Sequence, residues 1–252
     1  MSSPRVIAIT SGKGGVGKTF LAANLAAALA RAGRRVLVLD ADLGLANLDV
    51  VLNLHPKPTL HDVFTGRAPL AEAVLPAPGG FSVLLAGSGM IEYSRMTPAV
   101  REQFQNVVDE VAPRYDHVLL DTGAGISDVV LYAVSLAGRV LVVATPEPTS
   151  LADAYATIKV LATTQQRRHV YLLVNQVRRP GEGRLVRQQL QQVVDRYVSP
   201  AVAAPVHVEL LGEVPADGAV REAVQRRELL LEILPGAAAA VAIAAAAARI
   251  RE

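Results

Sequence analysis

The chain has 252 residues, a length that fits one large α/β domain and on length alone also permits two. Hydrophobic residues make up 51% of it and aromatic residues only 4%, so we expect a core built mainly of Val, Leu, Ile and Ala. Cysteine is absent, which excludes disulfides, thiolate metal sites and a cysteine nucleophile, and a formal net charge of +2 does not by itself indicate a nucleic-acid partner.

The N-terminal segment MSSPRVIAIT lacks the basic and apolar regions of a signal peptide, so none is expected. Residues 5–10 of this segment predict a short buried strand. Residues 20–33 are rich in Ala and Leu, end with a glycine and predict a helix. Between them lies GKGGVGKT, residues 12–19. This order of strand, glycine loop and helix directs a helix N-terminus at a phosphate group.

The loop fits the phosphate-loop pattern G-x-x-x-x-G-K-[ST]. Its glycines allow successive backbone N–H groups to turn inward, Lys18 supplies a charge for the β- and γ-phosphates, and the Thr19 hydroxyl can ligate Mg²⁺. A plain glycine-rich turn would explain the glycines but not the Lys-Thr pair. A second lysine, Lys13, follows the first glycine and is the unusual feature of the loop.

Two acidic residues follow the next predicted strand, residues 35–39. Asp40 and Asp42 come at its C-terminal end, where ligands bind in open parallel sheets. Simple surface polarity would also place acids there, but hydrolysis beside Mg²⁺ needs a group that holds the attacking water. We favour this catalytic interpretation, with Asp42 as the water-orienting residue.

A third acid, Asp121, ends the apolar run DHVLLD and is followed by TGAGI. Phosphate-loop NTPases present their second metal-supporting carboxylate in this way. The glycines after it, Gly123 first, leave backbone N–H groups free to approach a γ-phosphate, and loss of that phosphate could release the loop. The alternative is an ordinary strand end with a glycine turn.

The rest of the chain alternates between predicted strands and helices. Residues 53–80 are rich in proline and predict only two short helical pieces, at 59–64 and 69–74. Further predicted strands are 81–86 (ending in GSG), 139–145, 169–174 and 206–212. The third of these reaches Asn175, whose amide could pair with adenine. Predicted helices are 98–111, a helix whose N-cap is Thr149 or Ser150, 182–198, and a helix that begins after the turn at 214–217. This alternation predicts a single-domain α/β phosphate-loop NTPase over residues 1–252, with a mainly parallel, doubly wound sheet flanked by helices.

The C-terminal helix, about residues 236–251, is predicted to pack on the same domain. Its apolar run at 236–248 is too short and too rich in alanine to span a bilayer. Ile243 and Ile250 share one helical face, whereas Val241 points elsewhere. The helix has no Lys- and Arg-rich polar face, so we do not expect it to anchor the chain to a membrane.

With these segments assembled, the chain resembles the MinD/ParA class of deviant phosphate-loop ATPases, and within it the flagellar-number regulators FlhG, FleN and YlxH. KGGVGKT with the extra lysine is the class signature. DADLGLANLDVVLNL, PTLHDVFTG, LLAGSG, LLDTGAGI, TPEPTSLADAYA, LVNQV and LLLEILPG extend the resemblance over essentially the whole chain.

The resemblance implies a slow, Mg²⁺-dependent ATPase switch that pairs face to face when both copies hold ATP and is stimulated by partners. Lys13 would then reach the phosphates of the second copy. By analogy Lys18 holds phosphates, Asp42 positions the water, and Thr19, Asp40 and Asp121 serve the metal. Residues predicted to surround ATP or ADP are Gly12, Lys13, Gly14, Gly15, Val16, Gly17, Lys18, Thr19, Phe20, Gly123, Asn175, Pro215, Ala216 and Asp217.

The chain departs from its relatives at two places. Phe20 replaces the usual hydroxyl or amide residue, which removes a side-chain contact to the α-phosphate. FlhG proteins often carry an N-terminal extension that stimulates a GTPase and a basic amphipathic C-terminal tail, whereas here the first strand begins at Arg5 and the sequence ends with the alanine-rich helix. We therefore expect neither GTPase activation nor autonomous membrane attachment, and membrane binding only weakly or through partners.

The predicted function is regulation of flagellar number or placement through flagellar regulatory or switch proteins, in the cytoplasm, with partners recruiting the chain to the cell pole or membrane. One alternative is MinD-like division-site selection or ParA-like partitioning of DNA or cargo. DNA binding is not expected, because the arginine pairs at 167–168, 178–179 and 226–227 fit solvated helix ends and loops. Another alternative is a nucleotide-dependent binding module that never hydrolyses ATP.

Overall fold

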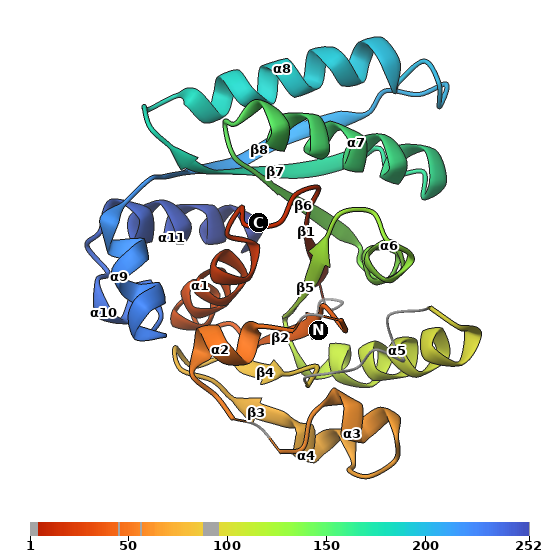
Figure 1. Ribbon diagram of the computed structural model, residues 1–252, viewed down its shortest axis with the longest axis vertical. Helices are drawn as coiled ribbons and strands as arrows, with labels where there is room; N and C mark the ends of the chain where they lie inside the picture. Colours follow the sequence, from red (N-terminus) through yellow and green to blue (C-terminus); the bar gives the residue numbers. More distant parts are fainter. Residues whose placement is uncertain (1–4, 45, 56, 88–95, 252) are drawn as a thin grey trace.

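The computed structural model describes residues 5–44, 46–55, 57–87 and 96–251. In this part of the chain eight strands form one sheet in the order β3-β4-β2-β5-β1-β6-β7-β8 (Figure 1). The strands are β1 (Arg5–Ser11), β2 (Val36–Ala41), β3 (Val74–Pro76), β4 (Ser82–Leu84), β5 (His117–Ala124), β6 (Arg139–Ala144), β7 (His169–Val177) and β8 (His207–Pro215). All neighbouring pairs are parallel except β3 with β4, which confirms the predicted mainly parallel sheet.

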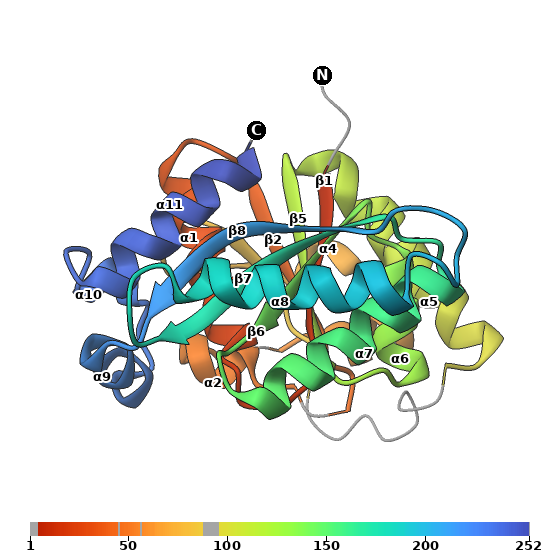
Figure 2. The ribbon, with the colours of Figure 1, turned by 90° about the horizontal axis from the view of Figure 1, so that it is seen from above.

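Helices cover both faces of the sheet, as the two views in Figures 1 and 2 show. One buried apolar cluster joins the sheet to α1 (Lys18–Arg31), α2 (Leu48–Leu52), α9 (Gly218–Arg226), α10 (Leu230–Ile233) and α11 (Ala238–Arg251). The cluster on the other face includes α3 (Leu60–Phe64), α4 (Leu70–Ala73), α5 (Pro98–Val111), α6 (Asp128–Ser135), α7 (Pro148–Thr164) and α8 (Glu182–Tyr197). A 3₁₀ helix, Ala112–Arg114, follows α5. Burial on both sides explains why the central strands are almost continuously apolar.

The order of the strands determines which loops meet. β1 lies between β5 and β6, so the loops that follow these three parallel strands leave the same edge of the sheet side by side. The chain adds β2 and β5 on one side of β1 and β6 to β8 on the other, which makes β1 the point where the winding direction changes. Open α/β sheets bind their ligands at this point.

Several predicted boundaries were wrong. The strands predicted to end at residues 39, 121, 174 and 212 continue to Ala41, Ala124, Val177 and Pro215, and α2, α6, α10 and β3 were not predicted. The cap of α7 is Glu147, because Pro148 occupies the first helical position, while the Ser150 hydroxyl accepts a hydrogen bond from Thr145 N. Residues 88 and 89 of the predicted GSG turn, and residues 1–4 of the N-terminal segment, lie outside the described residues.

Helix α11 packs against α1 and β8. Ile243 and Ile250 are buried and Val241 is 57% exposed, as the helical spacing predicted. Arg5 and Arg139 both donate hydrogen bonds to the Ile250 carbonyl oxygen, which ties the end of α11 to the first residues of β1 and β6. Among the described residues, no helix combines the length and apolarity needed to cross a bilayer.

Candidate functional site

The loop between β1 and α1 has the backbone that its glycines predict. Gly15 and Gly17 adopt left-handed conformations, with φ of 79° and 89°, which other residues rarely adopt. Gly12 is required for a different reason: a Cβ there would lie 2.2 Å from the carbonyl oxygen of Asp153 in α7. The loop is therefore shaped by its own conformation and by close packing against α7.

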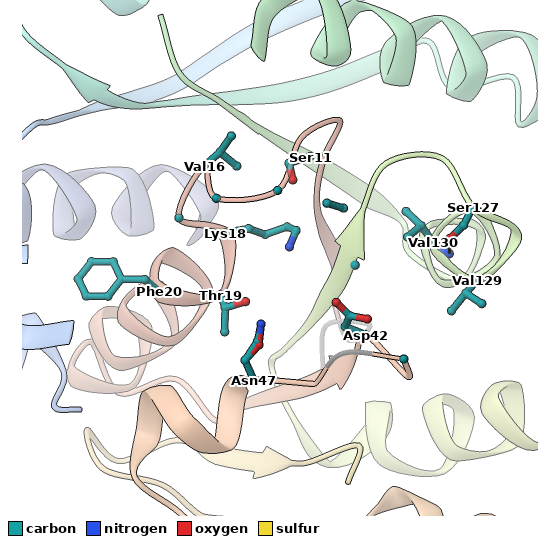
Figure 3. Close-up of a pocket in the computed structure, with 16 residues that line it drawn as sticks. Ser11, Val16, Lys18, Thr19, Phe20, Asp42, Asn47, Ser127, Val129 and Val130 are labelled. Carbon is teal, nitrogen blue, oxygen red and sulfur yellow. Dashed lines mark hydrogen bonds between the residues drawn. The ribbon is translucent and has the colours of Figure 1, made fainter. Parts of the chain in front are cut away.

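A cavity of about 610 Å³ opens above this loop (Figure 3). The Lys18 side chain extends into it, and the Asp42 carboxylate faces the cavity from the other side. Its lining residues come from the loop and α1, from the segment after β2 and from the β5–α6 connection: Ser11, Gly14, Gly15, Val16, Gly17, Lys18, Thr19, Phe20, Asp42, Gly44, Asn47, Gly123, Ala124, Ser127, Val129 and Val130. Most of the predicted phosphate-binding residues thus share one cavity.

Phe20 belongs to this lining, but its ring points away from the cavity (Figure 3). The ring is buried in the apolar cluster between the sheet and α1. Only the backbone of Phe20 therefore faces the predicted phosphate site.

Two carboxylates are buried behind the loop. Asp40 and Asp121 are 1% and 2% exposed and lie directly opposite each other on β2 and β5. Burial, and next the charge of Asp121, raise the pKa of Asp40 well above its usual value. Burial raises the pKa of Asp121 to about 6, although the Lys18 charge and a hydrogen bond from the Thr19 hydroxyl oppose the shift.

These carboxylates retain open acceptor positions. Asp40 Oδ1 accepts the Asp42 N–H at 3.1 Å, but Asp40 Oδ2 and Asp121 Oδ1 are buried with no hydrogen-bond partner in the described part of the chain. Buried carboxylate oxygens without protein partners are suited to bind a cation or water. In the described ranges no three His, Asp or Glu residues could hold a metal alone. This donor set fits Mg²⁺, which is commonly held by one or two carboxylates together with substrate phosphates.

Asp42 lies next to the connection that follows β5. A Cβ at Gly123 would be 3.3 Å from the Asp42 carboxyl carbon, so a glycine leaves room for this acid. Asn47, which precedes α2, also lines the cavity, and its amide points toward Thr19 (Figure 3). The residues of the two predicted loops thus meet at one wall of the cavity.

Lys13 is not among the described residues that line this cavity. Its Nζ instead lies 3.1 Å from Glu147 Oε2 and 3.1 Å from Thr149 Oγ1, at the start of α7. The two lysines of the loop therefore have different surroundings: Lys18 faces the cavity of its own chain and Lys13 does not.

The residues predicted to contact adenine have different surroundings in the structure. Asn175 Nδ2 donates to the Val16 carbonyl oxygen at 2.8 Å, so this amide supports the phosphate loop. The Asp217 carboxylate accepts the N–H groups of Ala219 and Ala239, which lowers its pKa and links the starts of α9 and α11. Ala216 lines a second cavity of about 410 Å³ at the ends of β6, β7 and β8.

The segment that follows β6 forms one wall of this second cavity. It is lined by Thr145, Pro146, Glu147, Pro148, Gln176, Arg178, Glu182 and Ala216. Gln176 has φ of 60°, an uncommon conformation for a residue other than glycine. The adenine contacts assigned to Asn175 and to Pro215, Ala216 and Asp217 stay predictions.

Sequence reasoning missed several residues of the site. Ser127 caps α6 by accepting the Val130 N–H, and a serine before Asp128 was a signal that could have predicted this helix. Asn47 follows Asp42 within the same loop. Glu147 and Thr149 gave no such signal, because they are more than 130 residues away from Lys13 in the sequence.

Comparison with known proteins identifies the chain's relatives. Residues 7–231 match the CobQ/CobB/MinD/ParA nucleotide binding domain. The chain belongs to this family. Membership confirms the MinD/ParA resemblance and the α/β phosphate-loop fold, and ATP hydrolysis is the general activity of the MinD/ParA ATPases.

Two relatives within the family are flagellar proteins. The antiactivator FleN of Pseudomonas aeruginosa is 41% identical over 250 residues, which cover 99% of this chain and 87% of FleN. The flagellum site-determining protein YlxH of Helicobacter pylori is 34% identical over 235 residues, covering 92% of this chain and 76% of YlxH. These matches confirm the narrower resemblance to FleN and YlxH.

A solved structure of the family has the same fold. The septum site-determining protein MinD of Pyrococcus horikoshii, complexed with Mg-ADP, matches with a TM-score of 0.78 and 27% identity, covering 98% of this chain and 95% of MinD. The chain is therefore a MinD/ParA-family nucleotide-binding protein whose catalytic and binding residues remain predictions from its own geometry.

Proposed function

We propose that this family member is an ATP-dependent dimerising ATPase that regulates flagellar number or placement through partner proteins. The observation that carries the proposal is the arrangement of the two loop lysines. Lys18 extends into the 610 Å³ cavity toward Asp42, whereas Lys13 leaves the cavity and lies at the surface, 40% exposed. One lysine can hold the chain's own nucleotide while the other remains available to a second copy.

The two cavities provide separate places for the parts of a nucleotide. The 610 Å³ cavity contains the glycine loop and the start of α1, whose N–H groups and positive end favour phosphate oxygens. The 410 Å³ cavity lies at the ends of neighbouring strands and is lined by Gln176, the residue after Asn175, and by Ala216. We infer that the phosphates occupy the first cavity and the adenine the second.

Thr19 would hold Mg²⁺ from within the cavity, with Asp121 and Asp40 behind it. Mg²⁺, when bound, supplies positive charge to the β- and γ-phosphate oxygens. Lys18 adds positive charge from the protein, and this charge opposes the rise that burial causes in the pKa of Asp121. Asp42 faces the same cavity and is the residue that would orient the attacking water.

The flagellar role rests on similarity to FleN and YlxH across nearly the whole chain. We propose that the ATP-bound dimer is the form recognised by flagellar regulatory proteins in the cytoplasm, and that these partners accelerate hydrolysis. Counting flagella by electron microscopy in cells that lack the gene tests this role. Unchanged flagellar number and placement would contradict it.

Lys13→Ala tests the dimeric switch. The variant should bind ATP, since Lys18 and the glycine loop remain, but should stay monomeric in ATP, because Lys13 is the group proposed to reach the second copy. Mass photometry with and without ATP measures the outcome. Lys159→Ala, which removes an exposed lysine further along α7, is the control. An ATP-induced dimer of normal strength in Lys13→Ala would refute the role of Lys13 in the second copy's site.

A further inference from the structure

Lys13 makes a specific contact with α7 in the single chain. Its Nζ lies 3.1 Å from Glu147 Oε2 and 3.1 Å from Thr149 Oγ1. The contact joins residues that are 134 and 136 positions apart. It forms because β1 and β6 are neighbours, so the loop after β1 and the segment after β6 leave the sheet together.

The backbone around Lys13 also holds it at this place. The Ser11 hydroxyl donates to the Lys13 carbonyl oxygen at 2.9 Å, and Gly12 packs so closely on Asp153 that no Cβ fits between them. The beginning of the phosphate loop is thus fixed against the first turns of α7. A lysine side chain that starts here reaches Glu147 without any change of the backbone.

Glu147 is the group that attracts the lysine. The positive N-terminal end of α7 repels an ammonium group, so on α7 itself the favourable contact of Lys13 in the described structure is the Thr149 hydroxyl. Glu147 occupies the cap position of α7, yet its side chain makes no capping hydrogen bond to the described residues. Its carboxylate therefore forms an ion pair with Lys13 and does not cap the helix.

We propose that Glu147 and Thr149 are positioning residues that hold Lys13 on its own chain and oppose its transfer to the second copy. The inference rests on the proposed ATP-dependent dimer. A lysine that contacts the other copy's phosphates must first leave Glu147 and Thr149. The strength of this contact then sets the protein concentration at which ATP-loaded chains pair.

The expected size of the effect follows from exposure and symmetry. The side chains of Lys13 and Glu147 are 40% and 60% exposed, and pairs of this kind change an equilibrium by roughly two- to fivefold. Each dimer releases two such contacts, so the effect on the dimerisation constant is the square, roughly 4- to 25-fold. This range is within reach of a direct measurement.

The experiment compares dimerisation of the full chain at saturating ATP and Mg²⁺ by mass photometry over a range of protein concentrations. Glu147→Gln should dimerise at roughly 4- to 25-fold lower concentration than the wild type. Thr149→Val should shift in the same direction by less, and Thr149→Ser, which keeps the hydroxyl, should remain close to the wild type. Glu72→Gln removes an exposed acid on α4 and serves as the matched control.

Ionic strength separates this electrostatic role from a structural one. The gap between wild type and Glu147→Gln should narrow as salt rises from about 0.05 to 0.5 M, because salt screens an exposed ion pair. If the wild type dimerises with ATP but Glu147→Gln dimerises equally or more weakly, the inference is wrong and the proposed function stands. If the wild type does not dimerise with ATP, the proposed function fails and the inference fails with it.

Discussion

Asp40 and Asp121 face each other on neighbouring strands with open acceptor positions, an arrangement that costs stability when no ligand is bound. Both pKa values are raised because the charged form of a buried carboxylate is disfavoured. A cation bound beside Asp40 and Asp121 would favour the ionised form of both carboxylates. We therefore expect a cation bound beside Asp40 and Asp121 to stabilise the folded chain.

Asp121→Asn should stabilise the nucleotide-free chain. The pKa of Asp121 is about 6 in the folded chain, and its ordinary value is 3.8. Between pH 3.8 and pH 6 the folded state therefore binds more protons than the unfolded state, and the free energy of unfolding falls as pH rises. Removing the charge should raise the free energy of unfolding by about 1 to 3 kcal/mol at pH 7.5 and by about half as much at pH 5. Urea unfolding without nucleotide at both values measures this.

The control for Asp121→Asn is Glu102→Gln, which removes an exposed acid on α5. An Asp121→Asn gain that is equal at pH 5 and pH 7.5 would contradict the proposed titration. The variant should also gain less stability from Mg²⁺ and ATP than the wild type does, because it loses a carboxylate predicted to support the metal.

Single residues at strand ends were predictable from the sequence, and their long-range partners were not. Asp42 and Asp121 each follow an apolar run, and parallel strands end at the same edge of the sheet. The structure places Asp42 in the lining of the cavity beside the phosphate loop and brings the Asp121 carboxylate within hydrogen-bonding reach of the Thr19 hydroxyl. The contact between Lys13 and Glu147 depends on the order of the strands, which local apolar patterns do not contain.

At the scale of elements, α8 and α11 protect the exposed edge of the sheet. β8 is an edge strand of nine residues, long enough to pair with another chain if it were open. Gln191 donates to the Val206 carbonyl oxygen and accepts the Val208 N–H, both at 2.8 Å, as a neighbouring strand would. Arg187 and Arg249 donate to the carbonyl oxygens of Val208 and Leu211.

Gln191→Ala should open this edge. The Val206 carbonyl oxygen and the Val208 N–H would lose their contacts with Gln191, which should lower the free energy of unfolding by about 1 kcal/mol and the melting temperature by about 2 to 4 °C. Open edges also pair with one another, so light scattering should increase with protein concentration. Differential scanning fluorimetry and light scattering test both effects, with the exposed neighbour Gln192→Ala as control. Equal behaviour of the two variants would show that Gln191 does not protect β8.

Long apolar elements were predicted more accurately than short or capped ones. Helix α5 has the predicted bounds and buries one apolar stripe, since a periodicity of 3.6 over fourteen residues determines one face. The strands instead run past their apolar cores into polar residues such as Asp40 and Asn175, because ladder hydrogen bonds depend on the neighbouring strand. The predicted N-cap of α7, Thr149 or Ser150, was wrong, because Pro148 occupies the first helical position and Glu147 is therefore the cap residue.

At the scale of the molecule, the segments that carry Asp42, predicted to be catalytic, and Gly123, predicted to bind nucleotide, lie at the ends of strands that are paired at the centre of the sheet. Asp42 follows β2 and Gly123 lies on β5, and the two strands pair up to Ala41 and Thr122. The Thr122 hydroxyl donates to the Ile9 carbonyl oxygen on β1, just before the phosphate loop. We therefore expect a change at the γ-phosphate to affect both segments, which would allow a partner that contacts them to distinguish ATP from ADP.

Asp42→Ala should lock the chain in its ATP form. The variant keeps Lys18 and Thr19 for binding, but loses the carboxylate predicted to orient water, so phosphate release should fall by about 10²-fold or more. ATP-bound dimers should then accumulate in mass photometry, and immobilised Asp42→Ala should retain partner proteins in ATP and release them in ADP. Asp109→Ala, a change of an exposed acid on α5, should hydrolyse ATP as the wild type does.

The same measurement separates the switch from a module that binds nucleotide without hydrolysing it. Unchanged phosphate release in Asp42→Ala would remove Asp42 from the catalytic site, since its position beside Gly123 and opposite Lys18 would then have no chemical consequence. Absence of phosphate release in the wild type, even with captured partners added, would instead favour the module. In that case the wild type and Asp42→Ala should retain partners equally in ATP, because neither could leave the ATP-bound form by hydrolysis.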